Sequence, residues 1–375
     1  MNGERGVARP PDTFSATDYR LMARALQLAE RGLETTTPNP RVGCVIAQGD
    51  RIVGEGWHAR AGEAHAEVLA LAEAGAAARG ATAYVTLEPC AHHGRTPPCT
   101  DALIAAGIAR VVAAMGDPNP AVQGRGVARL AQAGIAVSTG LLEAQAIELN
   151  RGFVSRMTRQ RPWIRLKLAT TLDGKTALNN GVSQWVTGPA ARADGHRWRA
   201  RACAILTGIG TVKADDPQLT VRAVACQRQP LRVVVDARLD ISPDARLLDG
   251  RPVLVAAAQV DPDKRDALAR RNAEVVCLPN PHGKVDLPAL ITELARRGLN
   301  EVHVEAGFKL NGSLLREGCV DELLIYQAAM LVGDSAQGAF NLAELTSLAD
   351  ARRLEVIDRR SIGDDVRLLA RLVAP

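Results

Sequence analysis

Short apolar runs alternate with segments of helical periodicity along most of the chain, and this alternation constrains the fold more than any other feature. Strands and helices that follow one another in series indicate a sheet covered by helices, so we expect an α/β/α sandwich in the first half. Its first helix is expected over 17–31, with Thr17 as a candidate N-cap. The strands expected in this half lie over 42–47, 51–57, 82–87, 110–115 and 135–138, with further helices over 65–78, 100–106 and 126–133.

A basic, weakly periodic stretch over 150–161 interrupts the alternation, and a second alternating series follows it. The chain has 375 residues, which is more than one typical core accommodates. We therefore expect one domain over 15–150 and a second α/β domain over 161–375. The strands expected in the second domain lie over 164–169, 204–207, 232–236, 253–257, 274–278, 301–305 and 322–327, with helices over 261–271 and 287–297.

The composition is that of an ordinary globular protein, with 47% hydrophobic and 23% charged residues. No window approaches 18 consecutive apolar residues, which excludes a membrane-spanning helix. The net charge is only +5, and basic runs such as 156–165 and 192–201 are interpreted as solvated faces or linkers. Residues 1–13 lack the apolar core of a secretion signal and predict a loose tail, so we expect a cytoplasmic protein.

Three residues of the first half, His65, Cys90 and Cys99, have the chemistry of zinc ligands, and a proline precedes each cysteine. Two thiolates and one imidazole leave the fourth tetrahedral position open for water, as in catalytic zinc sites. Zinc lowers the pKa of a bound water to about 7, so hydroxide is available at neutral pH. A structural zinc site would need a fourth protein ligand, for which His92 and His93 are the candidates.

Glu67 lies two residues after His65, at the start of the same expected helix. A carboxyl group beside the metal can take a proton from water and deliver it to a ring nitrogen and a leaving amine, which is what deamination requires. H-x-E followed by P-C-x-x-C is the signature of zinc deaminases. Here residues 91–98 separate the two cysteines, so the insertion is expected to form a loop beside the pocket.

Seven segments in two unrelated sets occur in a fixed order along the chain. They are TPNPRVG at 37–43, AGEAHAE at 61–67, EPCAHHGRTPPC at 88–99, KLATTLDGK at 167–175, SQWVTG at 183–188, ADDPQLTVR at 214–222 and VEAG at 304–307. Together they resemble the bifunctional deaminase/reductase family of riboflavin biosynthesis, over roughly residue 17 to the C-terminus. The long spacing between the cysteines is that family's form. Ala64 stands before His65 where many members have proline.

The resemblance implies a cytidine-deaminase-like first domain and a dihydrofolate-reductase-like second domain. It also implies two consecutive reactions. The first hydrolyses the exocyclic amine of a diaminopyrimidinone ribosylamine 5′-phosphate with zinc, and the second uses NADPH to reduce the ribosyl group to a ribityl chain. The partner is then a small phosphorylated pyrimidine, with no nucleic acid and no membrane, and a homo-oligomer is expected.

The resemblance also assigns roles to single residues. In the first domain, Asn39 would hold the pyrimidine through its amide, His58 would contact substrate, and Arg95 would meet the phosphate. In the second domain, the cofactor contacts that it implies are Ala169, Trp185, Thr211, Asp215, Gly307, Phe308, Lys309, Leu310, Asn311, Gly312 and Ser313. The substrate contacts that it implies there are Ser183, Arg199, Leu219, Arg222 and Glu305.

No G-x-G-x-x-G motif follows a strand in the second half, so the sequence does not support a Rossmann site. Gly307 instead follows an expected strand and opens a helix, whose first backbone amides suit a cofactor phosphate. The cofactor supplies hydride, so the protein must position the sugar and supply a proton. Lys167 and Asp215 are the candidates for this proton, and a structural salt bridge is the alternative role of Lys167.

Two other functions remain open at this point. A tRNA deaminase with a C-terminal binding module would gather basic and aromatic residues on one surface, whereas aromatics are 3% of this chain and its basic residues are scattered. A monofunctional nucleotide deaminase would have lost catalysis in its second half, which the intact motifs there argue against.

Overall fold

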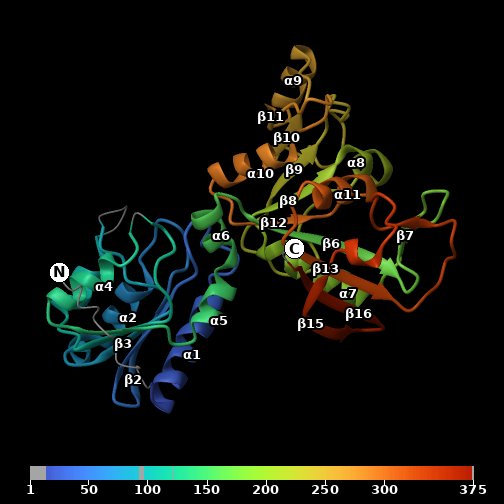
Figure 1. Ribbon diagram of the computed structural model, residues 1–375. Coiled ribbons are helices and arrows are strands. Elements are labelled where there is room, and N and C mark those ends of the chain that lie inside the picture. The colour runs from blue at the N-terminus through green and yellow to red at the C-terminus, as the bar shows by residue number, and fades with distance from the viewer. Residues whose placement is uncertain (1–13, 93–96, 121, 374–375) are drawn as a thin grey trace, which may run out of the picture. The chain divides into compact units, whose positions relative to one another are not determined.

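The computed structural model describes residues 14–92, 97–120 and 122–373 (Figure 1). The chain folds into two compact units, Met1–Thr158 and Arg159–Pro375. None of the helices in the described residues combines the length and apolar character that crossing a bilayer requires.

The first unit contains a mixed sheet whose strands, among the described residues, lie in the order β2-β1-β3-β4-β5. β1 is antiparallel to β2 and β3, whereas β3, β4 and β5 are parallel. The elements are α1 (Ala16–Glu30), β1 (Gly43–Gln48), β2 (Arg51–Trp57), α2 (Ala66–Ala74), η1 (Gly75–Ala78), β3 (Thr82–Val85), α3 (Cys99–Ala105), β4 (Arg110–Ala113), α4 (Arg125–Gln132), β5 (Ala136–Thr139), α5 (Glu143–Leu149) and α6 (Arg151–Arg159).

Glycines let two helices approach the sheet very closely. A Cβ added at Gly43 would lie 2.0 Å from the carbonyl oxygen of Ala25 in α1, and one at Gly56 would lie 2.2 Å from that of Ala66 in α2. Gly56 pairs with Cys44 across the sheet, so these two residues face the same side. Gly43 adjoins Cys44 along β1 and therefore faces the opposite side. The two helices therefore cover opposite faces of the sheet, as the expected α/β/α sandwich requires.

Two expectations for this unit are wrong in detail. The N-cap of α1 is Ser15 rather than Thr17, because Ser15 and Asp18 form a reciprocal capping box. The stretch over 150–161 is not irregular, since α6 occupies most of it directly after α5. The helical periodicity of this stretch is weak because some inward-facing positions carry arginines in place of apolar residues. Arg151, for example, is largely buried.

The second unit contains a larger sheet, with the order β11-β10-β9-β8-β12-β6-β13-β16-β15 among the described residues. Its strands are parallel from β11 to β13, and β16 and β15 add an antiparallel edge. The elements are β6 (Trp163–Thr171), β7 (Lys175–Ala177), α7 (Pro189–Arg201), β8 (Ala204–Gly208), α8 (Ile209–Asp215), β9 (Leu231–Val235), β10 (Val253–Ala257), α9 (Pro262–Ala269), β11 (Ala273–Cys277), α10 (Leu287–Arg296), β12 (Glu301–Val304), α11 (Phe308–Arg316), β13 (Glu322–Ala328), β14 (Gln337–Gly338), η2 (Leu348–Asp350), β15 (Leu354–Ile362) and β16 (Asp365–Leu372).

A buried ion-pair cluster joins the amino ends of the central strands. Arg165 of β6 is fully buried and donates to Glu322 of β13 over 2.7 Å. Arg201 of α7 donates to Glu301 of β12 over 2.9 Å, and the Arg165 guanidinium lies 4.3 Å from the ring centre of Trp198. The run over 192–201 is therefore part of a packed helix, which corrects its interpretation as a solvated face or linker.

We expect the substitution Gly56→Ala to destabilise the first unit by about 1–3 kcal/mol, the usual range for overpacking. The new Cβ would lie 2.2 Å from the Ala66 oxygen and 2.7 Å from the Ala70 nitrogen, so α2 has to move. Urea unfolding and zinc content measure the effect. Gly195→Ala is the control, because its Cβ meets nothing within 4 Å. Unchanged stability and zinc content in Gly56→Ala would contradict the argument.

Candidate active sites

The three expected zinc ligands lie together in the first unit. His65 is the N-cap of α2, Cys99 is the first residue of α3, and Cys90 lies in the loop after β3. The His65 Nδ1 atom is 3.2 Å from the Cys99 sulfur and 3.6 Å from the Cys90 sulfur. Zn–S bonds of about 2.3 Å and Zn–N bonds of about 2.0 Å place tetrahedral ligand atoms roughly 3.5 Å apart, so the three side chains fit one zinc ion.

Among the described residues, the candidate metal cluster contains three ligands and no fourth. His65, Cys90 and Cys99 form a cluster of donor atoms within 4.8 Å of one another, and His92 is not part of it. His93 lies outside the described residues. A set of three ligands is typical of a catalytic zinc site and not of a structural one.

The electrostatics of the two thiols differ. A hydrogen bond with the Cys99 thiol lowers the pKa of Cys90 to about 4, with help from His65 and from the Cys99 backbone N–H at 3.3 Å. The same hydrogen bond and burial raise the pKa of Cys99. One thiolate is thus already favoured in this arrangement, and a divalent cation favours the second.

Glu67 is buried on the first turn of α2, with 3% of its surface exposed. Burial raises the pKa of its carboxyl group to about 7, and its carboxyl group lies within hydrogen-bond reach of the Cys99 thiol. A carboxyl group with a pKa near neutrality exchanges protons readily in both directions at pH 7. The structure therefore places a carboxyl group suited to proton transfer beside the three ligands.

Asn39 and His58 also meet in this unit. The amide nitrogen of Asn39 lies 3.0 Å from the Nε2 atom of His58. The Asn39 loop is held by Asn150, whose amide accepts from the Arg41 backbone N–H over 2.8 Å and donates to the Arg41 carbonyl oxygen over 2.9 Å. Arg95, the third residue assigned to substrate here, lies outside the described residues.

Glu88 is a residue of this site that the sequence reasoning did not single out. Its buried carboxylate accepts hydrogen bonds from four backbone N–H groups, at distances of 2.8–3.2 Å. These groups belong to Asp117, Gly124, Gly126 and Val127, so the loop after β4 and the start of α4 are tied to the segment that carries Cys90. The signal was an acidic residue directly before the Pro-Cys pair.

The second unit gathers several expected substrate residues around one carboxylate. Glu305, which directly follows β12, pairs with Arg199 of α7 through two bonds of 2.5 and 2.7 Å. Arg199 also donates to the carbonyl oxygen of Thr220 over 2.9 Å, beside Leu219 and Arg222. Burial lowers the pKa of Lys167, which Glu305 opposes, and the Arg199 charge holds the pKa of Glu305 well below its usual range against the effect of burial.

Two histidines of this cluster were missed. His303 is fully buried, with its Nε2 atom 3.3 Å from the Glu305 carboxylate. His196 accepts from the backbone N–H of Arg222 over 3.4 Å, and burial with the Arg199 and Arg222 charges lowers its pKa to about 4. Neither stands in a recognisable motif, so only the fold brings them to the site.

The expected cofactor residues fall into separate groups. A Cβ added at Gly307, the N-cap of α11, would lie 3.7 Å from the Thr211 hydroxyl, so these two positions adjoin. Asn311 and Gly312 instead pack on the segment 339–341, where the Asn311 amide donates to the Ala339 oxygen over 3.2 Å. Phe308, Lys309, Leu310 and Ser313 lie in α11 between and after these positions.

Ser183 and Trp185 line a hollow of about 170 Å³ with Thr171 and Met330. Trp185 is 62% exposed, and the Arg192 guanidinium lies 4.5 Å from the centre of its ring. Asp215, at the end of α8, hydrogen-bonds to Gln184, the residue between Ser183 and Trp185. Lys167 lies elsewhere, near Glu305 and Arg199. Ala169 lies on β6, two residues from Lys167.

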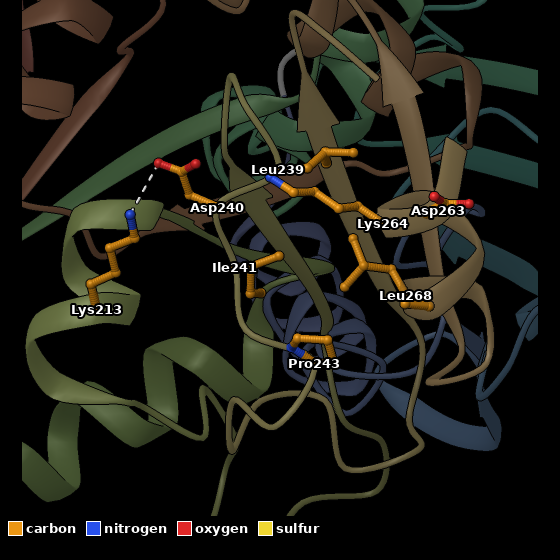
Figure 2. Close-up of a pocket in the computed structure, with 9 residues that line it drawn as sticks. Lys213, Leu239, Asp240, Ile241, Pro243, Asp263, Lys264 and Leu268 are labelled. Atoms are coloured by element: carbon orange, nitrogen blue, oxygen red, sulfur yellow. Dashed lines mark hydrogen bonds and ion pairs between the residues drawn. The ribbon is translucent and has the colours of Figure 1, made fainter. Parts of the chain in front are cut away.

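A larger cavity of about 480 Å³ lies beyond the carboxyl ends of β8, β9 and β10. Figure 2 shows Leu239, Ile241 and Leu268 around it, with the ion pair of Lys213 and Asp240 at its edge. Ligands of open parallel sheets bind outside the carboxyl ends of the strands, and this cavity and Gly307 lie on that side.

Comparison with known proteins identifies the family. Residues 15–115 match the cytidine and deoxycytidylate deaminase zinc-binding region, and residues 162–368 match the RibD C-terminal domain. The riboflavin biosynthesis protein RibD of Escherichia coli is 50% identical over 94% of this chain and 98% of its own. The chain belongs to the RibD family.

Solved RibD structures agree with this assignment. Acinetobacter baumannii RibD superposes with a TM-score of 0.88 at 42% identity, over 95% of this chain and 99% of its own. A Thermotoga maritima diaminohydroxyphosphoribosylaminopyrimidine deaminase/5-amino-6-(5-phosphoribosylamino)uracil reductase superposes with a TM-score of 0.85 at 33% identity, over 95% and 99% of the two chains.

The expected two-part enzyme is thereby confirmed. The chain combines a cytidine-deaminase-like zinc domain with a RibD reductase domain, and it is a bifunctional deaminase and reductase of riboflavin biosynthesis that uses zinc and NADPH. The readings as a tRNA deaminase or as a monofunctional deaminase are not favoured, since the match to RibD runs through both halves.

We expect Glu88→Ala to destabilise the first unit by about 1–3 kcal/mol, because it leaves the buried Gly126 N–H and three less buried N–H groups without their acceptor. Glu88→Gln retains one carbonyl oxygen and is expected to fall between Ala and wild type. Urea unfolding measures both variants, with the exposed Glu30→Ala as control. Equal stability of Glu88→Ala and Glu30→Ala would contradict the role of the carboxylate.

Proposed function

We propose that a domain over 15–150 holds zinc with His65, Cys90 and Cys99 and deaminates a diaminopyrimidinone ribosylamine 5′-phosphate. A second domain over 161–375 then reduces the ribosyl group of the product with NADPH. The observation that carries the deaminase assignment is the cluster of three donor atoms within 4.8 Å beside a carboxyl group that is 3% exposed. Membership of the RibD family supports the order of the two reactions.

In the deaminase, Glu67 is the proton carrier. Zinc, when bound, supplies a water molecule whose pKa is about 7. Glu67 would move one proton from this water to the ring nitrogen as the oxygen bonds to the amine-bearing carbon. It would then move the second proton, from the new hydroxyl group, to the amine, whose C–N bond breaks to release ammonia. Its burial excludes bulk water from the transfer and keeps its pKa close to neutrality. Asn39 holds the pyrimidine, and Arg95 serves the substrate phosphate.

In the reductase, Glu305 and its partners form the substrate site. Lys167, Arg199 and Arg222 carry three positive charges around one carboxylate, which leaves an excess that a substrate phosphate can neutralise. Arg199 already uses three of its N–H groups within the protein, so Arg222 is the better phosphate ligand. Ser183 and Leu219 complete the set.

NADPH supplies hydride to this site, and the protein supplies a proton. Lys167 is half-buried near Glu305, and its desolvation favours release of its proton, which suits a donor to the opening sugar ring. Cofactor contacts come from Ala169, Trp185, Thr211, Asp215 and the α11 segment 307–313. In that segment, the backbone amides of Phe308, Lys309 and Leu310 would bind the cofactor phosphate. Asn311 and Gly312 pack the helix on the segment 339–341.

The location proposed for the protein is the cytoplasm, and the proposed assembly is a homo-oligomer. A phosphorylated pyrimidine is its substrate, and an enzyme of this biosynthesis works in the cytoplasm on small metabolites. A homo-oligomer is consistent with the apolar side chains that β15 exposes at the edge of the sheet, such as Val356 at 58% exposure.

The substitution Glu67→Gln is expected to lower ammonia release by about 100-fold or more, since general acid–base catalysis contributes at least this much. The variant should retain one zinc per chain, because Glu67 is not a ligand, while a chelator should abolish release in wild type. Glu73→Gln on the same helix is the control, since Glu73 is exposed. Normal turnover by Glu67→Gln would remove the proposed role.

Two substitutions separate the candidate proton donors of the reductase. Lys167→Met is expected to lower the kcat of NADPH oxidation by about 100-fold or more. Asp215→Asn is expected to raise the KM for NADPH more than it lowers kcat, because Asp215 acts next to Gln184 and Trp185. Ammonia release serves as the control and should stay normal in both. A wild-type kcat for Lys167→Met would exclude it as donor.

A further inference from the structure

His58 stands directly after β2 and is 3% exposed, and both of its ring nitrogens are engaged within the protein. Nδ1 lies 3.1 Å from the carbonyl oxygen of Ala64, and Nε2 lies 3.0 Å from the amide nitrogen of Asn39. Its backbone N–H donates to the Val42 oxygen over 2.9 Å, which fixes the ring at its base. An imidazole held in this way has no nitrogen left for a polar contact with substrate.

The partners of His58 fix its tautomer. A carbonyl oxygen only accepts hydrogen bonds, so Nδ1 must carry the proton that it shares with Ala64. In the neutral ring Nε2 then bears a lone pair and can only accept. The group that faces it must be a donor, and the Asn39 amide nitrogen is that donor at 3.0 Å.

This arrangement removes the usual freedom of an asparagine amide to turn over. In the reversed orientation the Asn39 oxygen would face the lone pair of Nε2, with two acceptors in contact and no proton between them. Asn39 is therefore held with its Oδ1 atom away from His58. The amide is left to present one acceptor and one remaining N–H to whatever base lies against it.

The same imidazole relates Asn39 to the metal ligands. Ala64, which accepts the Nδ1 proton, is the residue before His65, and the His58 and His65 rings meet edge to face with centroids 5.3 Å apart. One rigid ring thus spans from the segment that carries a zinc ligand to the amide that meets the pyrimidine. A shift of His58 would alter the distance and the angle between the two.

We propose that His58 is a positioning residue of the deaminase, which fixes the amide of Asn39 so that its oxygen accepts a hydrogen bond from the amino or ring N–H group of the base. This inference rests on the proposed deaminase function and revises the expectation that His58 contacts substrate itself. The tautomer of His58, which is not a zinc ligand, then helps to determine which edge of the base the site binds.

A double-mutant cycle on kcat/KM for ammonia release tests the proposal. His58→Ala and Asn39→Ala are each expected to lower kcat/KM by roughly 10-fold to 100-fold. The double variant should match Asn39→Ala alone, because His58 acts through Asn39. Losses that multiply in the double variant would show that His58 makes a contact of its own and would overturn the proposal.

His58→Gln provides a second variant, since the glutamine oxygen can accept from the Asn39 amide. Partial recovery relative to His58→Ala is expected, and recovery that persists in the Asn39→Ala background would contradict the proposal. Zinc content should remain one per chain in every variant. Loss of zinc in His58→Ala would assign the residue to the metal site instead and also overturn the proposal.

The chain itself supplies the controls. NADPH oxidation with the deaminated intermediate, measured on the same samples, should stay at the wild-type rate in all variants. His282→Ala, at an exposed position in the second unit, should change neither activity. Glu67→Gln separates the two hypotheses: if it remains active, the proposed deaminase mechanism fails whatever the cycle shows, whereas an inactive Glu67→Gln with multiplicative losses in the cycle defeats only the role of His58.

Discussion

The close packing of α2 against the sheet is the constraint on which the deaminase site depends. His65 and Glu67 stand at the start of this helix, so their positions follow from where the helix lies. Gly54 and Gly56 bring the helix backbone to within van der Waals contact of β2, where an added Cβ would overlap the carbonyl oxygens of Ala70 and Ala66. Two glycines in a strand thus set the distance between a zinc ligand and the cysteines that come from other segments.

The chemistry of the first unit could be predicted from local sequence. His65 and Glu67 fall on one helix start, and Cys90 and Cys99 each follow a proline. These residue types and their neighbours indicated one zinc ion, although the cysteine spacing departs from the short signature. The partners that hold these residues were not visible, because they are distant in sequence. Glu88 binds N–H groups about thirty to forty residues further along the chain, and no periodic pattern reports such contacts.

The second unit shows the opposite balance. Its parallel strands were recognised from apolar runs, with Val253–Ala257 matching in full. The charged residues around Glu305 were assigned by resemblance only, because an arginine such as Arg199 looks like any surface arginine until a carboxylate faces it. The antiparallel strands β15 and β16 were missed, since charged residues interrupt their apolar residues. In β16, Asp365 and Arg367 stand at buried positions, so no alternation of apolar and polar residues marks the strand.

The ion-pair cluster of Arg165, Glu301 and Glu322 lies at the amino ends of the same strands whose carboxyl ends carry Glu305 and the cofactor residues. The ion pairs that stabilise the sheet and the residues assigned to the reaction thus lie at opposite ends of the strands. Loops at the reactive rim are free to diverge in length and composition while the far rim keeps the strands in register. The loops of such a sheet can change to bind other sugar phosphates while the pairing of its strands stays intact.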